Sequence, residues 1–257
     1  VQDANKGIFD AKAAEQIINT CQTQSDITGV PFALDIVGTT ETAFEKYIDF
    51  VPKHTDAPLM LDAMSPRTRM AAANLAKKMG LTDRCLYNSV YKGVTDAELA
   101  NLKESGITMS IVLADDPKDT TLEGKMNVIV EALALAEKGG ITQPLIDTAI
   151  PAFEPDMGTS VRAIPIMKEK YGHPVGLGSG NVVTTMGWVK ANFEKQFRKG
   201  TVCSTNTIMQ MAGANWLMIG PAEQAEWVFP AVAITDTYIA SAAADLGTRP
   251  LEETHPI

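Results

Sequence analysis

The residues best suited to chemistry in this sequence are carboxylates and carboxamides that close short apolar segments. Asp62 lies near the end of one such segment and Asp147 near the end of another. Asn88 and Ser89 close a third segment. A carboxylate accepts two parallel N–H bonds from an amino-pyrimidine edge, and a carboxamide both donates and accepts. The set therefore favours a neutral, flat, donor-rich heterocycle as ligand. Asp35 stands earlier in its own segment and is interpreted as a loop or solvated carboxylate.

The segment GLGSGN, residues 176–181, combines three glycines with Asn181. A glycine-rich loop can bind phosphate through its amides, but no lysine or arginine follows before Lys190. Gly178 and Gly180 are therefore predicted to leave space for a flat ring. Asn181 is interpreted either as a contact to that ring or as the N-cap of the next helix.

Other reaction classes have weaker support. Asp62 and Asp147 alone, without histidine, are a weak magnesium signal. The three cysteines and three histidines lack the spacing of zinc ligands. We therefore expect no bound metal. No apolar segment carries the lysine of a Schiff-base aldolase, and an unrelated metal-dependent lyase or aldolase is kept only as a third hypothesis.

Charge and hydropathy argue against a nucleic-acid-binding protein and against a membrane-spanning protein. The chain has 257 residues, 45% of them hydrophobic, and a formal net charge of −9 at pH 7. Because no local lysine or arginine cluster offsets this acidity, nucleic acid is a poor candidate ligand. The polar first residues lack the core of a signal peptide, and no run of about 18 apolar residues is long enough to span a bilayer. We expect a soluble cytoplasmic protein.

The elements that must position these side chains alternate regularly from about residue 31. Short apolar segments predict eight strands, at residues 31–38, 57–63, 84–90, 108–114, 143–149, 174–180, 201–205 and 216–220, with 201–205 the weakest. The amphipathic segments between them predict helices. This repeat predicts an α/β fold, a single (β/α)8 TIM barrel over residues 1–257, with a doubly wound open sheet as the alternative. The residues before 31 predict an extra N-terminal helix that covers the bottom of the barrel.

Capping residues support the predicted helices. Ser65 and Pro66 are typical of an N-cap and a first helical position, and Thr95 with Glu98 forms a capping box. Five glycines are predicted to follow helix ends in the left-handed conformation: Gly80, Gly106, Gly139, Gly172 and Gly200. In a barrel the C-terminal ends of the strands face the active site, so the carboxylates and carboxamides are expected at one mouth.

Five segments resemble the H-subunit family of tetrahydromethanopterin S-methyltransferase, which includes bacterial relatives that transfer methyl groups between corrinoid proteins and tetrahydrofolate. They are LMLDAMSPRTR, LYNSVY, QPLIDTAI, PVGLGSGN and GPAEQAEWVFPAVAITDTYIA. The resemblance spans roughly residues 31–257. Dihydropteroate synthase, another pterin-binding barrel, is a poorer match, because its late-strand lysine and terminal Arg-x-His are missing here.

The resemblance implies a role for each candidate residue. Asp62, Asn88 and Asp147 would hold the pyrimidine edge of a pterin. Asn181 would be the catalytic residue, beside the pterin N5 that gains or loses the methyl group. Ser89, Gly178 and Gly180 would complete the pterin site.

The resemblance also implies an activity and a partner. The chain would move a methyl group between a methylated corrinoid protein and tetrahydrofolate, giving 5-methyltetrahydrofolate. Tetrahydrofolate would be the methyl acceptor, and methylcobalamin would arrive on the partner, because this chain lacks a D-x-H-x-x-G signature. The alternatives are a tetrahydromethanopterin-specific transfer subunit and a non-catalytic pterin-binding subunit of a methyltransferase complex. The wide apolar face of the C-terminal helix is typical of a homodimer interface, and core packing is the alternative explanation.

Overall fold

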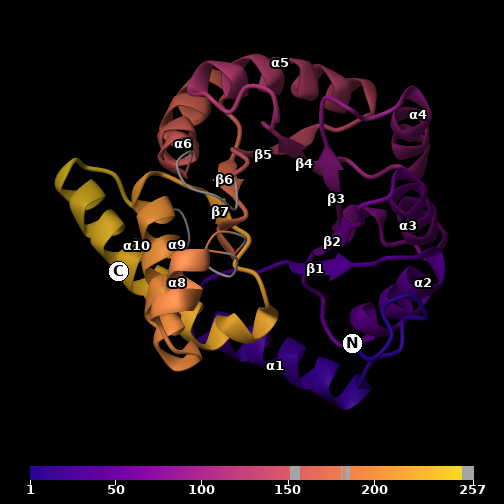
Figure 1. Cartoon of the computed structure of the whole chain (residues 1–257), viewed down its shortest axis with the longest axis horizontal. Coiled ribbons are helices and arrows are strands. Elements are labelled where there is room, and N and C mark those ends of the chain that lie inside the picture. Colours follow the sequence, from indigo (N-terminus) through magenta and orange to yellow (C-terminus); the bar gives the residue numbers. More distant parts are fainter. Residues whose placement is uncertain (151–156, 181, 183–185, 251–257) are drawn as a thin grey trace.

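Parallel strands in sequence order form the centre of the molecule. The computed structural model describes residues 1–150, 157–180, 182 and 186–250. Its seven-stranded sheet has the order β1-β2-β3-β4-β5-β6-β7 and curls around a centre (Figure 1). The strands are β1 (Leu34–Val37), β2 (Leu59–Asp62), β3 (Cys85–Val90), β4 (Met109–Leu113), β5 (Gln143–Asp147), β6 (Val175–Leu177) and β7 (Trp216–Leu217). A doubly wound sheet would reverse its strand order, so this alternative is wrong.

Helices surround the strands in an outer ring (Figure 1). They are α1 (Ala11–Thr28), α2 (Glu41–Phe50), α3 (Pro66–Lys78), α4 (Asp96–Ser105), α5 (Leu122–Lys138), α6 (Met157–Tyr171), α8 (Gly187–Asn192), α9 (Arg198–Met211) and α10 (Ala225–Asp245). Short 3-10 turns are η1 (Val51–Lys53), η2 (Thr82–Arg84), η3 (Lys195–Phe197) and η4 (Ala222–Gln224). Within the described ranges, no helix has the length and apolar character needed to cross a membrane.

The predicted strand at residues 201–205 is wrong, because this segment lies inside α9. The buried residues of α9 include Val202, Asn206 and Met209, which recur at the spacing of one helical face. Short β-branched segments are ambiguous between strand and helix, and here the longer helical pattern decides. The described sheet therefore has seven strands instead of the predicted eight.

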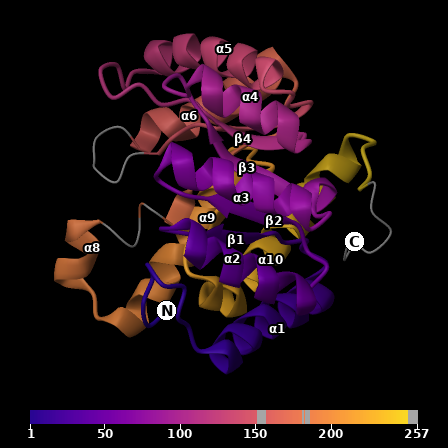
Figure 2. The ribbon, with the colours of Figure 1, turned by 90° about the vertical axis from the view of Figure 1, so that its right-hand side faces the viewer.

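The N-terminal helix is present, but it does not cover the bottom of the barrel. Helix α1 packs against α10 and η4, and both views place it in the outer ring beside the strands (Figures 1 and 2). Cys21 of α1 is buried with Ala225 and Phe229 of α10. The apolar face of α1 therefore packs against the side of α10.

The strands alternate between two apolar layers. Leu59 and Leu61 belong to the large core that lies between the sheet and the outer helices. Met60 belongs to a smaller cluster that also contains Leu86 and Ile111. Because successive side chains of a strand point to opposite faces, this smaller cluster fills the barrel interior. Asp62 follows Met60 by two residues and therefore points to the same interior.

The capping predictions are partly confirmed. Ser65 and Pro66 are the N-cap and first residue of α3, although the Ser65 side chain makes no capping bond. The Thr95 hydroxyl accepts from the Glu98 amide at 3.2 Å, but the Glu98 side chain turns elsewhere. Gly80, Gly106 and Gly172 have positive φ, whereas Gly139 has φ −74° and the next residue, Gly140, has φ 85°. Gly200 lies inside α9, so its predicted role as a helix terminator is wrong.

Candidate active site

Two of the predicted residues are direct neighbours at the end of the sheet. In the parallel ladders Val37 of β1 pairs with Asp62 of β2, and Asp62 pairs with Asn88 of β3. Neighbouring strands lie about 4.8 Å apart, and side chains in register point to the same face. The carboxylate of Asp62 and the carboxamide of Asn88 therefore lie side by side at the C-terminal mouth of the barrel.

Asp147 reaches the same end of the sheet from another part of the ring. It is the last residue of β5, paired with Leu113 of β4 on one side and with Gly176 of β6 on the other. A side chain at position 176 would clash with the Trp216 backbone and ring, so the glycine leaves room for that tryptophan. Strand β4 stands between Asn88 and Asp147, so carboxylates approach the mouth from two sides of the ring.

A bulge carries Ser89 past the regular register. The β3–β4 ladder pairs Tyr87 with Ser110 but Val90 with Val112, so β3 has one more residue than β4 between these pairs. The peptide bond joining Asn88 to Ser89 is cis. Bulges occur often at barrel rims and beside active sites, where they redirect side chains. Ser89 is half-buried at this bulge.

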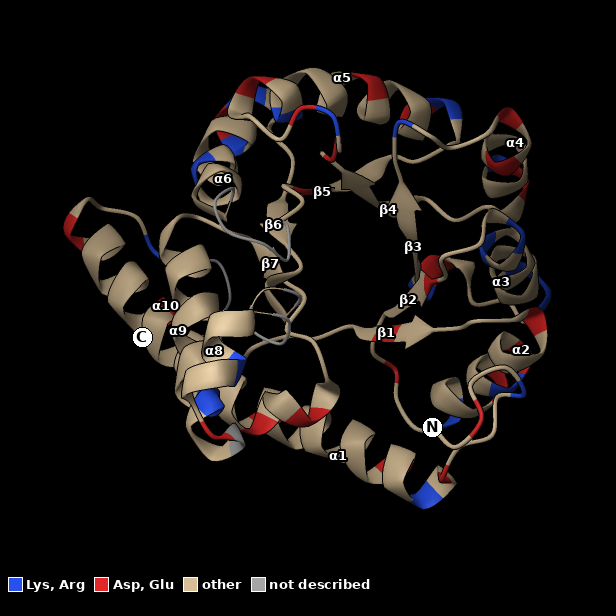
Figure 3. Cartoon of the chain, viewed as in Figure 1, with Lys and Arg blue, Asp and Glu red and all other residues tan. Residues whose placement is uncertain are grey.

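The side chains at the mouth have few partners within the protein. In the part of the chain that the structure describes, Asp62, Asn88 and Ser89 make no side-chain hydrogen bonds. The charged residues of the seven strands are Asp35, Asp62 and Asp147 alone, and Figure 3 shows lysine and arginine on helices and connecting loops. Polar groups that folding leaves without partners are ready to bind a ligand with several N–H donors.

Asp147 is the most deeply buried of these carboxylates. It is 7% exposed, and its Oδ1 accepts the Ala149 amide at 2.7 Å. Burial raises the pKa of Asp147 to about 6, although the Ala149 amide and the Lys125 charge oppose this shift. At neutral pH the carboxylate is therefore mostly ionised and able to accept hydrogen bonds.

Asp35 also faces the interior near the mouth of the barrel, which its position within its apolar segment did not indicate. It lies two residues before Val37 on β1 and pairs with Met60, so it points into the barrel below Asp62. The Asp35 side chain is exposed, but the surrounding protein removes part of its hydration. This desolvation, with a smaller contribution from the charge of Asp62, raises the pKa of Asp35 to about 7. Burial also raises the pKa of Asp62, against the charge of Arg69. Strand alternation in LDIV was the signal that could have identified Asp35.

The glycine segment after β6 is fixed by packing. A side chain at Gly180 would meet the backbone of Gly220 at 2.5 Å, so this glycine permits close contact between the two chain segments. The Ser179 hydroxyl donates to Asn206 at 2.7 Å and is fully buried. Gly178 is buried as well. Asn181, the predicted catalytic residue, lies outside the described residues.

Buried cations near the mouth were also missed by sequence reasoning, which found almost no cation among the strand ends. Arg69 of α3 is 6% exposed and Lys125 of α5 is 2% exposed. Both side chains donate to backbone carbonyls of the loops that follow the site aspartates. No group of three or more His, Cys, Asp or Glu in the described ranges is arranged to hold a metal ion.

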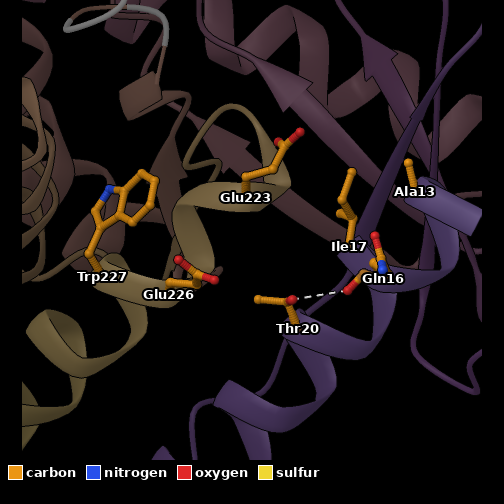
Figure 4. Close-up of a pocket in the computed structure, with 7 residues that line it drawn as sticks. All are labelled: Ala13, Gln16, Ile17, Thr20, Glu223, Glu226 and Trp227. Atoms are coloured by element: carbon orange, nitrogen blue, oxygen red, sulfur yellow. Dashed lines mark hydrogen bonds between the residues drawn. The ribbon is translucent and has the colours of Figure 1, made fainter. Parts of the chain in front are cut away.

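A separate hollow of about 320 Å³ lies on the outside of the barrel, between α1 and the start of α10 (Figure 4). Its lining residues are Ala13, Gln16, Ile17, Thr20, Glu223, Glu226 and Trp227. Thr20 donates to the Gln16 carbonyl within α1 at 2.9 Å. None of these residues comes from a strand, so this hollow is separate from the aspartates of the mouth.

The fold is that of solved dihydropteroate synthases. The enzyme of Xanthomonas albilineans in complex with 7,8-dihydropteroate superposes with a TM-score of 0.62 and 18% identity, covering 90% of this chain and 88% of that chain. The enzyme of Coxiella burnetii in complex with pteroic acid gives a TM-score of 0.63 and 16% identity, covering 91% and 87%. At this identity the likeness defines a fold class, the α/β barrel with a curled parallel sheet.

Sequence comparisons assign the family within this class. The family described as tetrahydromethanopterin S-methyltransferase MtrH subunit matches residues 1–251. Proteins named as the H subunit of this methyltransferase, from Methanococcus maripaludis and Methanocaldococcus jannaschii, are 41% and 40% identical, covering 100% of this chain and 86% of each relative. A Methanosarcina mazei relative, named as the H subunit of a putative mtx methyltransferase, is 36% identical with the same coverage. The chain belongs to the MtrH family.

These relatives correct the predicted pterin. The interpretation of the chain as a tetrahydrofolate methyltransferase, with tetrahydrofolate as acceptor, is wrong, because the relatives are named for tetrahydromethanopterin. The alternative of a tetrahydromethanopterin transfer subunit agrees with them. The family match also begins at residue 1, whereas the resemblance in the sequence was expected to span only residues from about 31 onward.

Proposed function

We propose that the mouth of the barrel binds the pterin ring of a tetrahydromethanopterin and that the chain contributes this site to a methyltransferase of several subunits. The main support for this proposal is the pairing of Asp62 with Asn88 in register, together with Asp147 at the same end of the sheet. The family supplies the identity of the pterin, because the relatives are named for tetrahydromethanopterin.

The chemistry of the mouth suits the amino-pyrimidine edge of a pterin. Asp147 has one oxygen bound to the Ala149 amide, and no other hydrogen bond reaches its carboxylate from the described residues. Its other oxygen, with the carboxylate of Asp62, accepts the N–H groups of the ring edge. Asn88 donates to ring acceptors and accepts from ring donors. Ser89, Gly178, Gly180 and Asn181 remain predicted members of the same site.

Methyl transfer to or from a pterin nitrogen is a displacement at carbon and needs no protein nucleophile. The protein contributes position, exclusion of water and control of protons. When the methyl group leaves the pterin N5, that nitrogen must carry a proton. Asp35, with its pKa near 7, holds a proton at neutral pH in part of the molecules and lies in the same interior. We therefore add Asp35 to the proposed site as its proton-holding group.

The second substrate is proposed to be a corrinoid carried by a partner protein, as the family resemblance implies. Helix α8 follows β6 in the chain and stands away from the other helices (Figure 2). Trp188 of α8 is 59% exposed and meets Phe193 edge to face at 5.5 Å. Met64, two residues after Asp62, is 98% exposed. Exposed apolar side chains around a site are typical of a surface for a macromolecular partner.

Calorimetry with tetrahydromethanopterin tests the pterin site. We expect Asp62→Asn and Asp147→Asn each to weaken binding about tenfold or more, because each removes acceptor capacity. The matched control is Asp56→Asn, an exposed aspartate before β2 at the opposite end of the barrel, which should bind like the unchanged chain. Absence of binding to the unchanged chain, or equal affinity in all three variants, would contradict the proposal.

A further inference from the structure

Asp62 and Asp147 of the proposed pterin site are each followed by main chain that a buried cation holds. We propose that Arg69 and Lys125 are matched positioning residues, each fixing the backbone directly after one aspartate and thereby the direction of its carboxylate. This inference rests on the proposed pterin site and deepens it.

Arg69 holds the chain after Asp62. Its Nη1 donates to the carbonyl of Ala63 at 2.6 Å and lies 3.4 Å from the carbonyl of Met64. These are the first and second residues after the aspartate. Arg69 is 6% exposed, so water competes little for these contacts. The loop that leaves β2 is therefore tied to a fixed point on α3.

Glu98 anchors Arg69 and extends the network to the next strand. Its Oε1 accepts Arg69 Nε at 2.8 Å and also the hydroxyl of Tyr87. Glu98 is fully buried, and Tyr87 directly precedes Asn88 on β3. This explains why Glu98 does not complete the predicted capping box, because a buried guanidinium is a stronger partner than a backbone amide. One network thus borders both Asp62 and Asn88.

Lys125 holds the chain after Asp147 in the same way. Its Nζ donates to the carbonyls of Thr148 and Ala149, both at 2.8 Å. The Ser160 hydroxyl also donates to the Ala149 carbonyl, at 3.1 Å. Again the carbonyls belong to the first and second residues after the aspartate. Lys125 is 2% exposed.

The Lys125 contact continues directly to the carboxylate. Ala149 has φ 55°, in the left-handed region that alanine rarely adopts. With its carbonyl held by Lys125, its amide points at Asp147 and donates to Oδ1 at 2.7 Å. The cation therefore maintains a backbone conformation that orients a site carboxylate.

The chain contains a comparable contact away from the site. Arg84 Nη2 donates to the carbonyls of Thr55 and Ala57, both at 2.7 Å. These residues precede β2, at the end of the barrel opposite the mouth. Arg84 thus provides a matched control, a cation that fastens a loop without bordering the aspartates.

The test compares tetrahydromethanopterin affinity, its pH dependence and the urea stability of the full chain in four variants. Lys125→Met should weaken binding about tenfold, and Lys125→Arg should restore most of it. Removal of the Lys125 charge should also move the acid limb of binding to higher pH, because that charge lowers the pKa of Asp147. Arg69→Lys keeps the positive charge beside Glu98 but loses the guanidinium group, which contacts Glu98 and the Ala63 carbonyl at the same time. This variant should weaken pterin binding severalfold. Arg84→Met should lower stability and leave affinity within twofold.

The outcomes separate the two proposals. If the unchanged chain fails to bind the pterin, the proposed function fails. If it binds, but folded Lys125→Met and Arg69→Lys match its affinity and pH profile, the positioning role is overturned. Loss of affinity in Arg84→Met equal to that in Lys125→Met would also overturn it, because the effect would then follow from lost stability alone.

Discussion

Asp35 and Asp62 lie on the inner face of neighbouring strands, offset by one layer, and their carboxylates interact. The ladder pairs Val37 with Asp62 and Asp35 with Met60, which places one carboxylate diagonally below the other. Although Asp35 is exposed, partial desolvation by the surrounding protein, and then the charge of Asp62, raises the pKa of Asp35 to about 7. Two carboxylates that share a site resist joint ionisation.

The first prediction concerns this pair. Asp62→Asn should lower the pKa of Asp35, because it removes a like charge, while leaving it above the ordinary value because the partial desolvation of the carboxyl persists. NMR titration of the Asp35 carboxyl carbon measures the change. Asp56→Asn, an exposed aspartate before β2, should not move it. An unchanged Asp35 titration in Asp62→Asn would show that the two groups do not interact.

The second prediction concerns the pH dependence that Asp147 gives to the free energy of unfolding. The pKa of Asp147 is raised to about 6 in the folded chain from 3.8, so the folded state binds more protons than the unfolded state between these values. Stability contributed by this group is therefore present at pH 4 and lost as pH rises through 6. Asp147→Asn should raise the unfolding free energy at pH 8 by about 2–3 kcal/mol relative to its effect at pH 4. Urea denaturation at both pH values measures this, and an equal effect at both would contradict it.

Much of the mouth was predictable because strand ends are visible in the sequence. Asp62, Asn88 and Asp147 follow apolar segments, and parallel strands bring their ends together whatever the details of packing. Asp35 is exposed, as expected of a solvated carboxylate, but it lies in β1 and not in a loop. Its place on the inner face was missed because its distance from the end of its segment was weighed and its alternation was not. The segment 201–205 was too short to distinguish strand from helix, and the surrounding α9 decided it.

The supporting cations were not predictable in the same way. Lys125 and Arg69 occur in helices where the sequence pattern is equally typical of solvent-exposed positions. Their burial depends on loops distant in sequence, such as the carbonyls of Thr148 and Ala149 that Lys125 contacts. Local pattern carries no information about such a contact, whereas the three-dimensional structure locates it directly.

A third prediction concerns the Glu98 network. Tyr87→Phe removes a fully buried hydroxyl that donates to Glu98, and should lower the unfolding free energy by about 1–3 kcal/mol. Tyr47→Phe is the matched control: Tyr47 is also buried, but its hydroxyl makes no side-chain hydrogen bond in the described part of the chain. Urea denaturation compares the two. Equal stability of both variants would show that the Glu98 contact contributes nothing.

The last prediction concerns two glycines whose replacement by alanine should change the stability in opposite directions. At Gly176 an added Cβ would lie 2.0 Å from the Trp216 carbonyl oxygen. Because this neighbour is backbone, Gly176→Ala should destabilise the chain by about 1–3 kcal/mol. Gly200 lies in α9 with nothing within 4 Å of the same atom. Gly200→Ala should therefore stabilise by about 0.5–1 kcal/mol through helix propensity. Destabilisation by Gly200→Ala in thermal or urea unfolding would contradict this expectation.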